Sequence, residues 1–290
     1  MKVTAFCPGH ITGFFLPCEH QDPLRTGSRG AGMCVDRGVT TTVTSRPGSG
    51  RIEAIVDGRR QYAEVTLAAA RRLLGDERLD LTVESQMDLP PSAGFGTSAA
   101  GALSAAFALA EILGRPPEDA FAAAHLAELA NHTGLGDVAA LTRGGMTFRR
   151  KEGLPPYGLI DRLTDRMDIV AAVVGGRMRT SEVLGDPSRR AMIERVGMEC
   201  CRRLESEPTP EAFFRLSREF TERSGIAGER VSLALRAAEG LGASSMIMLG
   251  NSVFAAGDLE AIEKKWKPLG PTFRLSLDVL GPRVLSGGHS

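Results

Sequence analysis

The hydrophobic and polar positions in the first part of the chain predict several β-strands. Residues 79–85 alternate apolar and polar side chains, which is the period of a strand with one buried face. Residues 35–45 are rich in Val and Thr and predict a second strand. Residues 3–6 predict a short strand that runs into Pro8-Gly9, where we expect a turn.

Helical patterns follow in the middle and in the second half of the chain. One helix is expected from Ser98 to about Leu113, and the next follows Pro116-Pro117 and reaches about Asn131. Asp57-Gly58 predicts a hairpin with a type I′ turn. The other elements are expected as helices at 67–74, 187–204, 210–223, 229–241 and 259–265, and as strands at 51–56, 61–65, 145–150, 168–174, 245–249, 253–256 and 272–279.

The order of these elements predicts an α+β protein with two layered domains. Strands and helices mix without a strict β-α-β-α alternation, which disfavours a parallel α/β fold. The 290 residues exceed the usual size of a single domain. Residues 151–163 are rich in Pro and Gly, which is typical of a joint between domains. We therefore expect one domain over residues 1–160 and a second over residues 161–290.

Composition and charge narrow the class of protein. Lys and Arg together number 35, as do Asp and Glu, so the formal net charge is zero. A nucleic-acid-binding protein normally carries a basic excess or stripe, so nucleic acid is not an expected partner. The uncharged stretch from Leu89 to Ala110 is interrupted by Pro and Gly, whereas a membrane span needs about 20 mostly apolar residues. We expect a buried helix there and no membrane partner.

The five cysteines indicate a reducing compartment. Their number is odd, no CxxC pair occurs and no signal peptide precedes them, so a disulfide framework is disfavoured and a cytoplasmic location is expected. Cys7, His10, Cys18 and His20 are close enough in sequence to be considered for a zinc site. No second ligand pair has zinc-finger spacing, so reduced structural thiols are the favoured interpretation.

The most informative segment is the loop and helix start over residues 89–100. Gly94 and Gly96 permit positive φ angles and close approach of the backbone to a ligand. The amides of Thr97 to Ala99 are unpaired donors at a helix N-terminus, which carries about half a positive charge. Such a junction can bind an anion, and Thr97 or Ser98 can cap the helix or offer a hydroxyl to phosphate or Mg²⁺. Capping alone would explain these hydroxyls equally well.

The pattern of this loop differs from two common nucleotide-binding motifs. It lacks the GxxxxGKS or GxxxxGKT pattern of a Walker-type loop, and GxGxxG does not fit either. A dinucleotide site is therefore disfavoured.

Blocks of the sequence resemble the motifs of the GHMP kinases. Pro91-Ser-Ala-Gly-Phe-Gly-Thr-Ser-Ala-Ala100 is similar to their phosphate-loop signature P-x-x-x-G-L-G-S-S-A-A, with Phe95 for Leu and Thr97 for the first Ser. Pro8-Gly-His-Ile-Thr-Gly13 resembles the first family motif, and Met248-Leu-Gly-Asn-Ser-Val-Phe-Ala255 stands at the place of the third. The runs 5–15, 27–32 and 133–138 are similar to the archaeal pantoate kinase branch.

This resemblance spans nearly the whole chain and implies both a fold and an activity. The implied fold is an N-terminal domain like the second domain of ribosomal protein S5, followed by a ferredoxin-like α+β domain. The implied activity is transfer of the γ-phosphoryl group of ATP, with Mg²⁺, to the 4-hydroxyl of pantoate on the archaeal route to coenzyme A. The implied ATP-binding residues are Pro91, Ser92, Ala93, Gly94, Phe95, Gly96, Thr97, Ser98 and Ala99.

The resemblance also suggests roles for three polar side chains. Asp137 stands in a Gly-rich turn where many GHMP kinases carry a catalytic Asp, which accepts or orients the substrate proton. Asp is also a favoured helix N-cap, and the two roles are compatible. Glu128 and Ser98 are the candidate Mg²⁺ ligands, although Glu128 is equally well explained as a solvated charge on a helix face.

A carboxylate substrate calls for a guanidinium group, which can bind it through two parallel hydrogen bonds. Arg29 is the first candidate because Gly27, Ser28 and Gly30 flank it, and Arg25 and Arg179 are weaker candidates. The other residues expected to bind the substrate are His10, Thr12, Ser28, Gly250 and Asn251.

Three other functions stay open at the level of the sequence. The same fold could act on another alcohol, such as homoserine or mevalonate. The chain could be a nucleotide-binding sensor without turnover, which the joint presence of Ser98, Glu128 and Asp137 disfavours. It could also be a structural protein whose glycine loop only caps a helix. The sequence does not indicate whether copies of the chain form a homo-oligomer.

Overall fold

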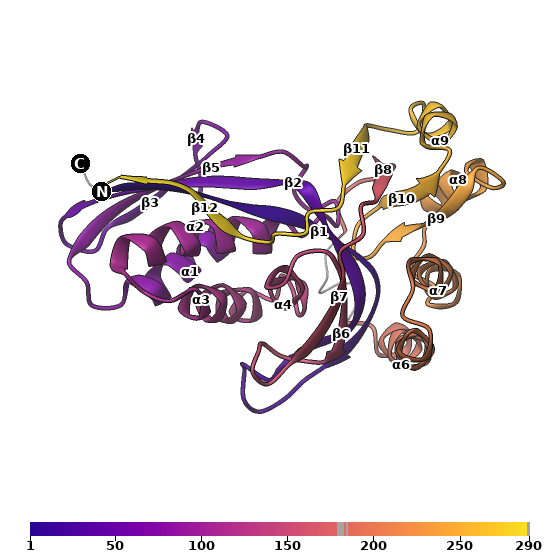
Figure 1. Cartoon of the computed structure of the whole chain (residues 1–290), viewed down its shortest axis with the longest axis horizontal. Coiled ribbons are helices and arrows are strands. Elements are labelled where there is room, and N and C mark those ends of the chain that lie inside the picture. The colour runs from indigo at the N-terminus through magenta and orange to yellow at the C-terminus, as the bar shows by residue number, and fades with distance from the viewer. Residues whose placement is uncertain (179–182, 184, 289–290) are drawn as a thin grey trace.

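The computed structural model describes residues 1–178, 183 and 185–288, and this part of the chain forms two β-sheets (Figure 1). The strands are β1 (Lys2–Cys18), β2 (Gly27–Pro47), β3 (Ile52–Val56), β4 (Arg59–Arg60), β5 (Leu79–Met87), β6 (Met146–Lys151), β7 (Leu159–Leu163), β8 (Asp168–Val173), β9 (Gly242–Ile247), β10 (Ser252–Gly257), β11 (Thr272–Ser276) and β12 (Arg283–Gly288). The larger sheet has the order β12-β1-β2-β5-β3-β4, with β6 paired to β2 and β7 paired to β6. The smaller sheet has the order β11-β8-β10-β9.

Helices pack against both sheets (Figure 1). They are α1 (Glu64–Leu74), α2 (Thr97–Leu113), α3 (Pro117–Ala130), α4 (Asp137–Leu141), α6 (Pro187–Ser206), α7 (Pro210–Arg223), α8 (Glu229–Ala237) and α9 (Leu259–Trp266). The first four lie with the larger sheet, and α2 contacts β1 and β2 through buried alanines that allow close packing. None of these helices, in the part of the chain that is described, is both long and apolar enough to cross a membrane.

Several helices begin at residues that satisfy free backbone amides. The side chain of Asp186 accepts hydrogen bonds from the amides of Ser188 and Arg189 at the start of α6. Thr209 and Asp258 cap α7 and α9 in the same way. These caps satisfy amides that have no partner within the helix.

The smaller sheet has the ferredoxin-like arrangement that the sequence led us to expect. Numbered within this sheet in chain order, its strands lie in the order 4-1-3-2, and all neighbours are antiparallel. Helices separate the first strand from the second and the third from the fourth. This is the β-α-β-β-α-β pattern. The predicted two-part α+β fold is therefore confirmed.

The long strands β1 and β2 join the two parts of the molecule. They pair from Lys2↔Thr44 to Cys18↔Gly27, with bulges at Pro8/Gly9 and at Thr12/Phe14. The second half of β1 stays paired with β2 and packs against α6 and α7, where Phe15 meets Phe220 with ring centroids 5.7 Å apart. The middle of β1 therefore lies at the junction between the two sheets (Figure 1).

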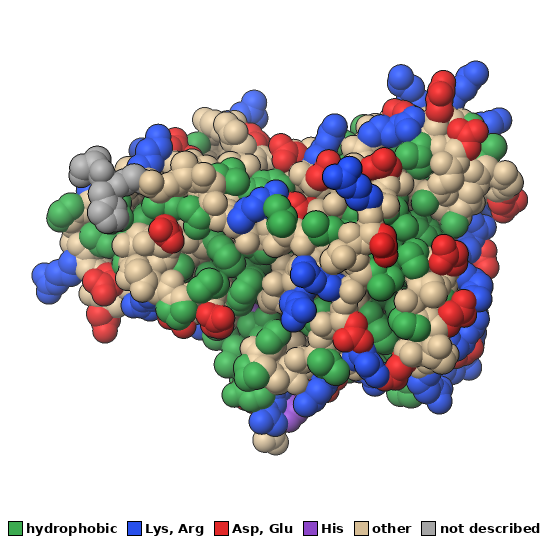
Figure 2. Space-filling model, in the orientation of Figure 1, with side chains coloured by type: hydrophobic (Ala, Val, Ile, Leu, Met, Phe, Trp, Pro, Cys, Tyr) green, Lys and Arg blue, Asp and Glu red, His purple; other side chains and the backbone are tan. Residues whose placement is uncertain are grey.

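Charged side chains of both signs mix over α6 to α9, as Figure 2 shows for one face of the molecule. Arg203 and Glu219 lie 2.6 Å apart, and Arg223 lies 2.8 Å from Glu199. These partly exposed pairs tie α6 to α7 and contribute little individually, because solvent screens them.

Two local predictions require correction. The strand expected to end near Phe6 continues to Cys18, because backbone pairing with β2 resumes after the bulge at Pro8/Gly9. The strand expected at 61–65 is wrong: β4 ends at Arg60 and α1 begins at Glu64. The type I′ hairpin is confirmed, since Val56 pairs with Arg59 across Asp57 and Gly58, whose φ angles are 49° and 74°.

The C-terminal strand was not expected, and it changes the picture of how the chain divides. β12 pairs with β1 in the larger sheet, although it follows all the strands of the smaller sheet in sequence. β7 runs across residue 160 and also belongs to the larger sheet. The sheets thus do not separate at a single point of the sequence, and the limits 1–160 and 161–290 stay a prediction.

Candidate active site

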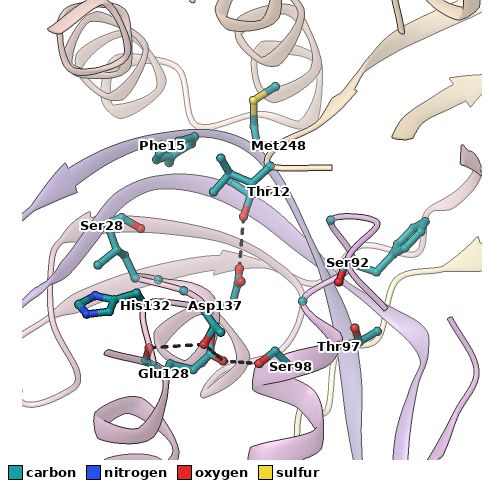
Figure 3. A pocket seen from close by; sticks show the side chains of 18 of the residues that line it. Thr12, Phe15, Ser28, Ser92, Thr97, Ser98, Glu128, His132, Asp137 and Met248 are labelled. Carbon is teal, nitrogen blue, oxygen red and sulfur yellow. Dashed lines mark hydrogen bonds between the residues drawn. The ribbon is translucent and has the colours of Figure 1, made fainter. Parts of the chain in front are cut away.

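A cavity of about 570 Å³ lies between the loop that precedes α2, the loop that precedes α4, and the middle of β1 and β2 (Figure 3). Segments that are far apart in sequence meet there, because the long strands carry their side chains past the ends of α2 and α3. Its lining consists of Thr12, Phe15, Ser28, Glu64, Ser92, Gly94, Phe95, Gly96, Thr97, Ser98, Glu128, Asn131, His132, Thr133, Gly134, Leu135, Gly136, Asp137, Arg149, Met178, Met248 and Leu249.

The loop before α2 has the geometry of a phosphate-binding loop. Gly94 and Gly96 have φ angles of 92° and 62°, which favour glycine. Gly96 is the N-cap of α2, and among the described residues no side chain caps this helix. We had expected Thr97 or Ser98 as the cap. Without one, the first amides of a 17-residue helix stay available to an anion at its positive end.

A turn after β9 supports this loop from behind. A Cβ atom on Gly94 would lie 2.8 Å from a methyl carbon of Ile247 and 3.2 Å from the Cα of Gly250. On the other side, the backbone amide of His10 donates a 2.9 Å hydrogen bond to the carbonyl of Phe95. The loop is thus fixed between β1 and the β9–β10 turn.

Glu128 is a buried carboxyl group at the edge of the phosphate-binding loop. Its Oε1 atom accepts hydrogen bonds from Ser98 Oγ at 2.6 Å and from Thr133 Oγ1 at 2.8 Å (Figure 3). Burial raises the pKa of Glu128 to about 7, and the two hydroxyl donors counteract only part of this rise. The group therefore gains or loses a proton near neutral pH, and a cation nearby would favour its charged form.

Asp137 is the first residue of α4 and faces the same cavity. Its Oδ1 atom lies 2.7 Å from Nδ1 of His10 and 3.4 Å from Oγ1 of Thr12. Burial acts to raise the pKa of Asp137, but the hydrogen bond from His10 and the positive charge of Arg149 outweigh it and lower this pKa. The side chain keeps 28% of its surface exposed. Asp137 is thus an ionised and accessible carboxylate at neutral pH.

Arg149, on β6, is a functional candidate that we did not identify from the sequence. Its side chain is 1% exposed. Among the described residues that line the cavity, Arg149 is the one arginine. Its Nε atom donates to the carbonyl of Ser28 at 3.1 Å, while its buried Nη1 atom has no hydrogen-bond partner among the residues that the structure describes. A buried cation with an unpaired donor is costly, so this group is prepared for an anionic partner.

Comparisons with known proteins show the family of the chain. The GHMP kinases N-terminal domain family matches residues 61–145. The chain is 36% identical over 272 residues to a pantoate kinase of Thermococcus kodakarensis, and the match covers 91% of this chain and 90% of that protein. The chain belongs to the pantoate kinase family of GHMP kinases.

Other similar proteins match this pantoate kinase family member over nearly its full length. A pantoate kinase of Methanospirillum hungatei is 33% identical over 296 residues, which covers 100% of this chain and 98% of that protein. A solved structure described as a phosphotransferase related to the CoA biosynthesis pathway superposes with a TM-score of 0.89 at 31% identity, over 98% of both chains. A homoserine kinase of Cytophaga hutchinsonii, at 16% identity and a TM-score of 0.69 over 98% and 97% of the two chains, shares the fold.

Most of the residues expected from the motifs of the pantoate kinase family meet in the one cavity. Pro91, Ala93 and Ala99 do not line it; they belong to the backbone that shapes the loop. Gly250 packs against Ala93, and Asn251 donates to the carbonyl of Gly176 at 2.9 Å. His10 lies behind Asp137 and is fully buried. The expected residues that do line the cavity are Thr12, Ser28, Ser92, Gly94, Phe95, Gly96, Thr97, Ser98, Glu128 and Asp137.

The expectation for Arg29 requires correction. Successive residues of a strand point to opposite faces, so Ser28 faces the cavity whereas Arg29 faces away from it. The charge of Arg29 instead acts on Cys201 and Glu205 of α6. Arg25 lies over the ring of Tyr157, with its guanidinium carbon 4.7 Å from the centroid. Arg179, the third candidate, is outside the described residues.

The residues considered for zinc do not form a metal site. Cys7 and Cys18 lie at separate points along the extended β1, and the ring of His10 is engaged by Asp137. Over residues 1–178, 183 and 185–288, no three His, Cys, Asp or Glu side chains gather in a way that could hold a metal ion.

Proposed function

We propose that this chain is a pantoate kinase, which transfers the γ-phosphoryl group of ATP to the 4-hydroxyl of pantoate and forms 4-phosphopantoate for coenzyme A biosynthesis. Relatives named pantoate kinase are 30% to 36% identical to it over most of its length. The observation that carries the proposal is a single cavity that joins a helix N-terminus without a side-chain cap, the carboxyl groups of Glu128 and Asp137, and a buried guanidinium. These groups suit a nucleoside triphosphate and a hydroxy acid bound side by side.

The phosphate-binding loop is the site for the triphosphate of ATP. The amides that follow Gly96 point to the cavity from the positive end of α2, and the first turn of this helix contains no acidic residue. Fixed amide dipoles stabilise negative charge on the transferred phosphoryl group without having to reorient.

Glu128 and Ser98 have the chemistry needed to hold the Mg²⁺ ion that accompanies ATP. Both present oxygen atoms next to the loop, and their hydrogen bond of 2.6 Å shows that the two oxygens are close enough to share one cation. Mg²⁺ usually takes one or two protein oxygens and fills its other positions with phosphate and water. When bound, the ion neutralises charge on the phosphates.

Arg149 is the proposed partner of the pantoate carboxylate. Its Nη1 atom has no hydrogen-bond partner in the described part of the chain, and the carbonyl of Ser28 accepts a hydrogen bond from its Nε atom, so the guanidinium plane is already oriented. Thr12, Phe15, Ser28 and Met248 lie on the side of the cavity away from Ser92 and Thr97 (Figure 3). Phe15 and Met248 offer an apolar surface to the two methyl groups of pantoate, and Thr12 offers a hydroxyl. The acid thus lies between Arg149 and the phosphate-binding loop.

Asp137 acts on the hydroxyl that attacks. As an ionised carboxylate, it accepts the proton of the 4-hydroxyl while the hydroxyl oxygen forms a bond to the γ-phosphorus. The bond between the γ-phosphorus and the β,γ-bridging oxygen breaks in line, and ADP leaves. The proton stays on Asp137 until product release, when solvent removes it.

The test is an assay of the purified chain with ATP and Mg²⁺ and three acceptors, namely pantoate, homoserine and mevalonate. We expect ADP and 4-phosphopantoate, with the position of the phosphate assigned by NMR. Transfer to mevalonate or homoserine but not to pantoate would replace the proposed acceptor. Binding of ATP without transfer to any of the three would support a nucleotide sensor instead.

A further inference from the structure

His10 is fully buried in β1 and contacts both halves of the candidate site. Its backbone amide donates to the carbonyl of Phe95 in the phosphate-binding loop, at 2.9 Å. Its ring atom Nδ1 lies 2.7 Å from Oδ1 of Asp137. One residue therefore connects the loop that binds phosphate to the carboxylate that acts on the acceptor, and it does so without lining the cavity itself.

The surroundings of the His10 ring determine which nitrogen carries the proton. Nε2 is buried and has no hydrogen-bond partner among the described residues. It lies against the backbone of β2, where a Cβ atom on Gly32 would be only 2.4 Å away. A doubly protonated ring would bury a donor without an acceptor next to the cation of Arg149, so the ring is neutral with its proton on Nδ1. Burial lowers the pKa of His10, in agreement with this state.

The two oxygens of Asp137 consequently have different surroundings. Oδ1 accepts hydrogen bonds from His10 and from Thr12, both on β1. Oδ2 lies toward Gly134, where a Cβ atom would be 3.6 Å from it and 2.2 Å from Oε2 of Glu128. Oδ2 is therefore the oxygen on the side of Glu128, and it is free to meet the acceptor hydroxyl.

Local structure alone would not hold this carboxylate. Asp137 follows the glycine-containing stretch 134–136, and α4 is only five residues long. Glycines leave the backbone many conformations, so the orientation of Asp137 depends on tertiary contacts. The contact from His10 is the shorter of the two that reach Oδ1.

We propose that His10 is a positioning residue for phosphoryl transfer: its neutral Nδ1–H holds Oδ1 of Asp137, so that Oδ2 faces the acceptor hydroxyl at a fixed distance from the phosphate-binding loop. This inference rests on the proposed function, since it assigns a task to Asp137. It differs from our sequence-based expectation that His10 binds the substrate. It also differs from a purely structural role, in which a buried histidine only fills the core.

Three substitutions separate these roles. Asn places an amide N–H close to the position of Nδ1, Gln places it close to Nε2, and Leu provides similar volume without a donor. If His10 positions Asp137, H10L and H10Q lose about 10- to 100-fold in kcat, within the range for a misplaced proton acceptor, while the KM for ATP stays within about twofold. The kcat of H10N should be at least about tenfold higher than the kcat of H10L.

The decisive measurement is the single-turnover rate of the double variant that combines H10L with Asp137→Asn. Because His10 acts through Asp137, H10L should cause no further loss of rate in the D137N background. Equal additional losses in both backgrounds would overturn the proposal, as would equal activity of H10N and H10Q. If H10L fails to fold, the comparison of H10N with H10Q decides alone.

A control variant accounts for loss of stability. Thr41→Val removes a buried hydrogen-bond network in β2, where Thr41 meets Ser85 at 2.9 Å and Ser104 at 2.7 Å, away from the cavity. T41V should lower the melting temperature and leave kcat unchanged. If a loss of packing in this sheet were enough to lower kcat, T41V would lower it as well.

Failure of the wild-type protein to phosphorylate pantoate would contradict the proposed function and not this inference. The His10 variants are then measured with whichever acceptor the wild type accepts, and the pattern among them tests this inference separately.

Discussion

Ser98 and Glu128 form a 2.6 Å hydrogen bond that joins the first turn of α2 to the last turn of α3. It brings a hydroxyl from the phosphate-binding loop and a carboxyl from a helix 30 residues further along the chain to one point of the cavity. The bond explains why Glu128 faces inward, although its helix carries no strong amphipathic pattern. It also leads to the first prediction.

The metal-free protein should lose stability as the pH rises toward 7, because of Glu128. The folded chain raises the pKa of this group from 4.5 to about 7, so the folded state binds the proton more tightly than the unfolded state does. The stabilisation is fully present below about pH 4.5 and is lost as the pH passes through about 7. From the shift, the contribution is on the order of 3 kcal/mol.

Urea unfolding in the presence of a chelator, at pH 5 and pH 8, measures this effect. Glu128→Gln is the matched control, because it keeps the shape of the side chain and cannot titrate. The unfolding free energy of the wild type, relative to that of E128Q, should be lower at pH 8 than at pH 5. Parallel pH profiles for the two proteins would show that Glu128 does not titrate in this range.

Asp137→Asn should lower kcat by about 10²- to 10⁴-fold, because an amide cannot accept the proton of the hydroxyl. The side chain keeps its shape, and it does not contact the loop that binds phosphate in any hydrogen bond among the described residues. Stabilisation of the protein by ATP in a thermal melt should therefore be retained. A kcat within about threefold of wild type would remove Asp137 from the chemistry.

Arg149→Lys should raise the KM for pantoate by about 10- to 100-fold with a smaller effect on ATP, because lysine keeps the charge but lacks the planar fork. Arg150→Ala is a control from the next residue in the strand; Arg150 is partly exposed, does not line the cavity, and pairs with Asp161 at 3.2 Å. Arg29→Ala is a second control, since Arg29 does not line the cavity. If R29A raises the KM for pantoate and R149K does not, the carboxylate is bound elsewhere.

Gly94→Ala should weaken ATP binding beyond its effect on stability. The φ angle of Gly94 is 92°, and a Cβ atom there would lie 2.8 Å from Ile247, so the loop must move. Gly50→Ala is a matched control, because Gly50 has a φ of 90° and nothing within 4 Å of the added atom. Both variants should lose about 1–2 kcal/mol of stability from the unfavourable backbone angle. Only G94A should raise the KM for ATP; equal values for the two variants would contradict the assigned role of the loop.

Features with a local cause could be predicted from the sequence. Gly94 and Gly96 stand out because positive φ angles strongly favour glycine. The turn at Asp57-Gly58 was predictable for the same reason. Asp137 was identifiable from its Gly-rich setting together with the resemblance to a family, and it does face the cavity.

Features that depend on strand pairing could not be predicted in this way. Arg149 and Arg150 are adjacent and chemically identical in the sequence, and the pairing of β6 with β2 decides which of them faces the cavity. The exchange of Arg29 for Arg149 as the candidate carboxylate partner has the same origin, because the alternation of β2 turns Arg29 away from the cavity and toward α6. β12 pairs with a strand almost 280 residues earlier, and nothing in its own residues indicates that partner.

The sequence by itself determined the conformation of the phosphate-binding loop, the hairpin turn, the helix starts and the family, since each depends on residues that are close together in the chain. The tertiary structure alone decided that His10 lies behind Asp137, that Glu128 meets Ser98, and that Arg149 points into the cavity. The physical reason is that side chains of distant segments meet only when those segments pack together. The packing of α2 against α3 brings Ser98 to Glu128, and the pairing and register of a strand decide which of its alternating side chains face the cavity.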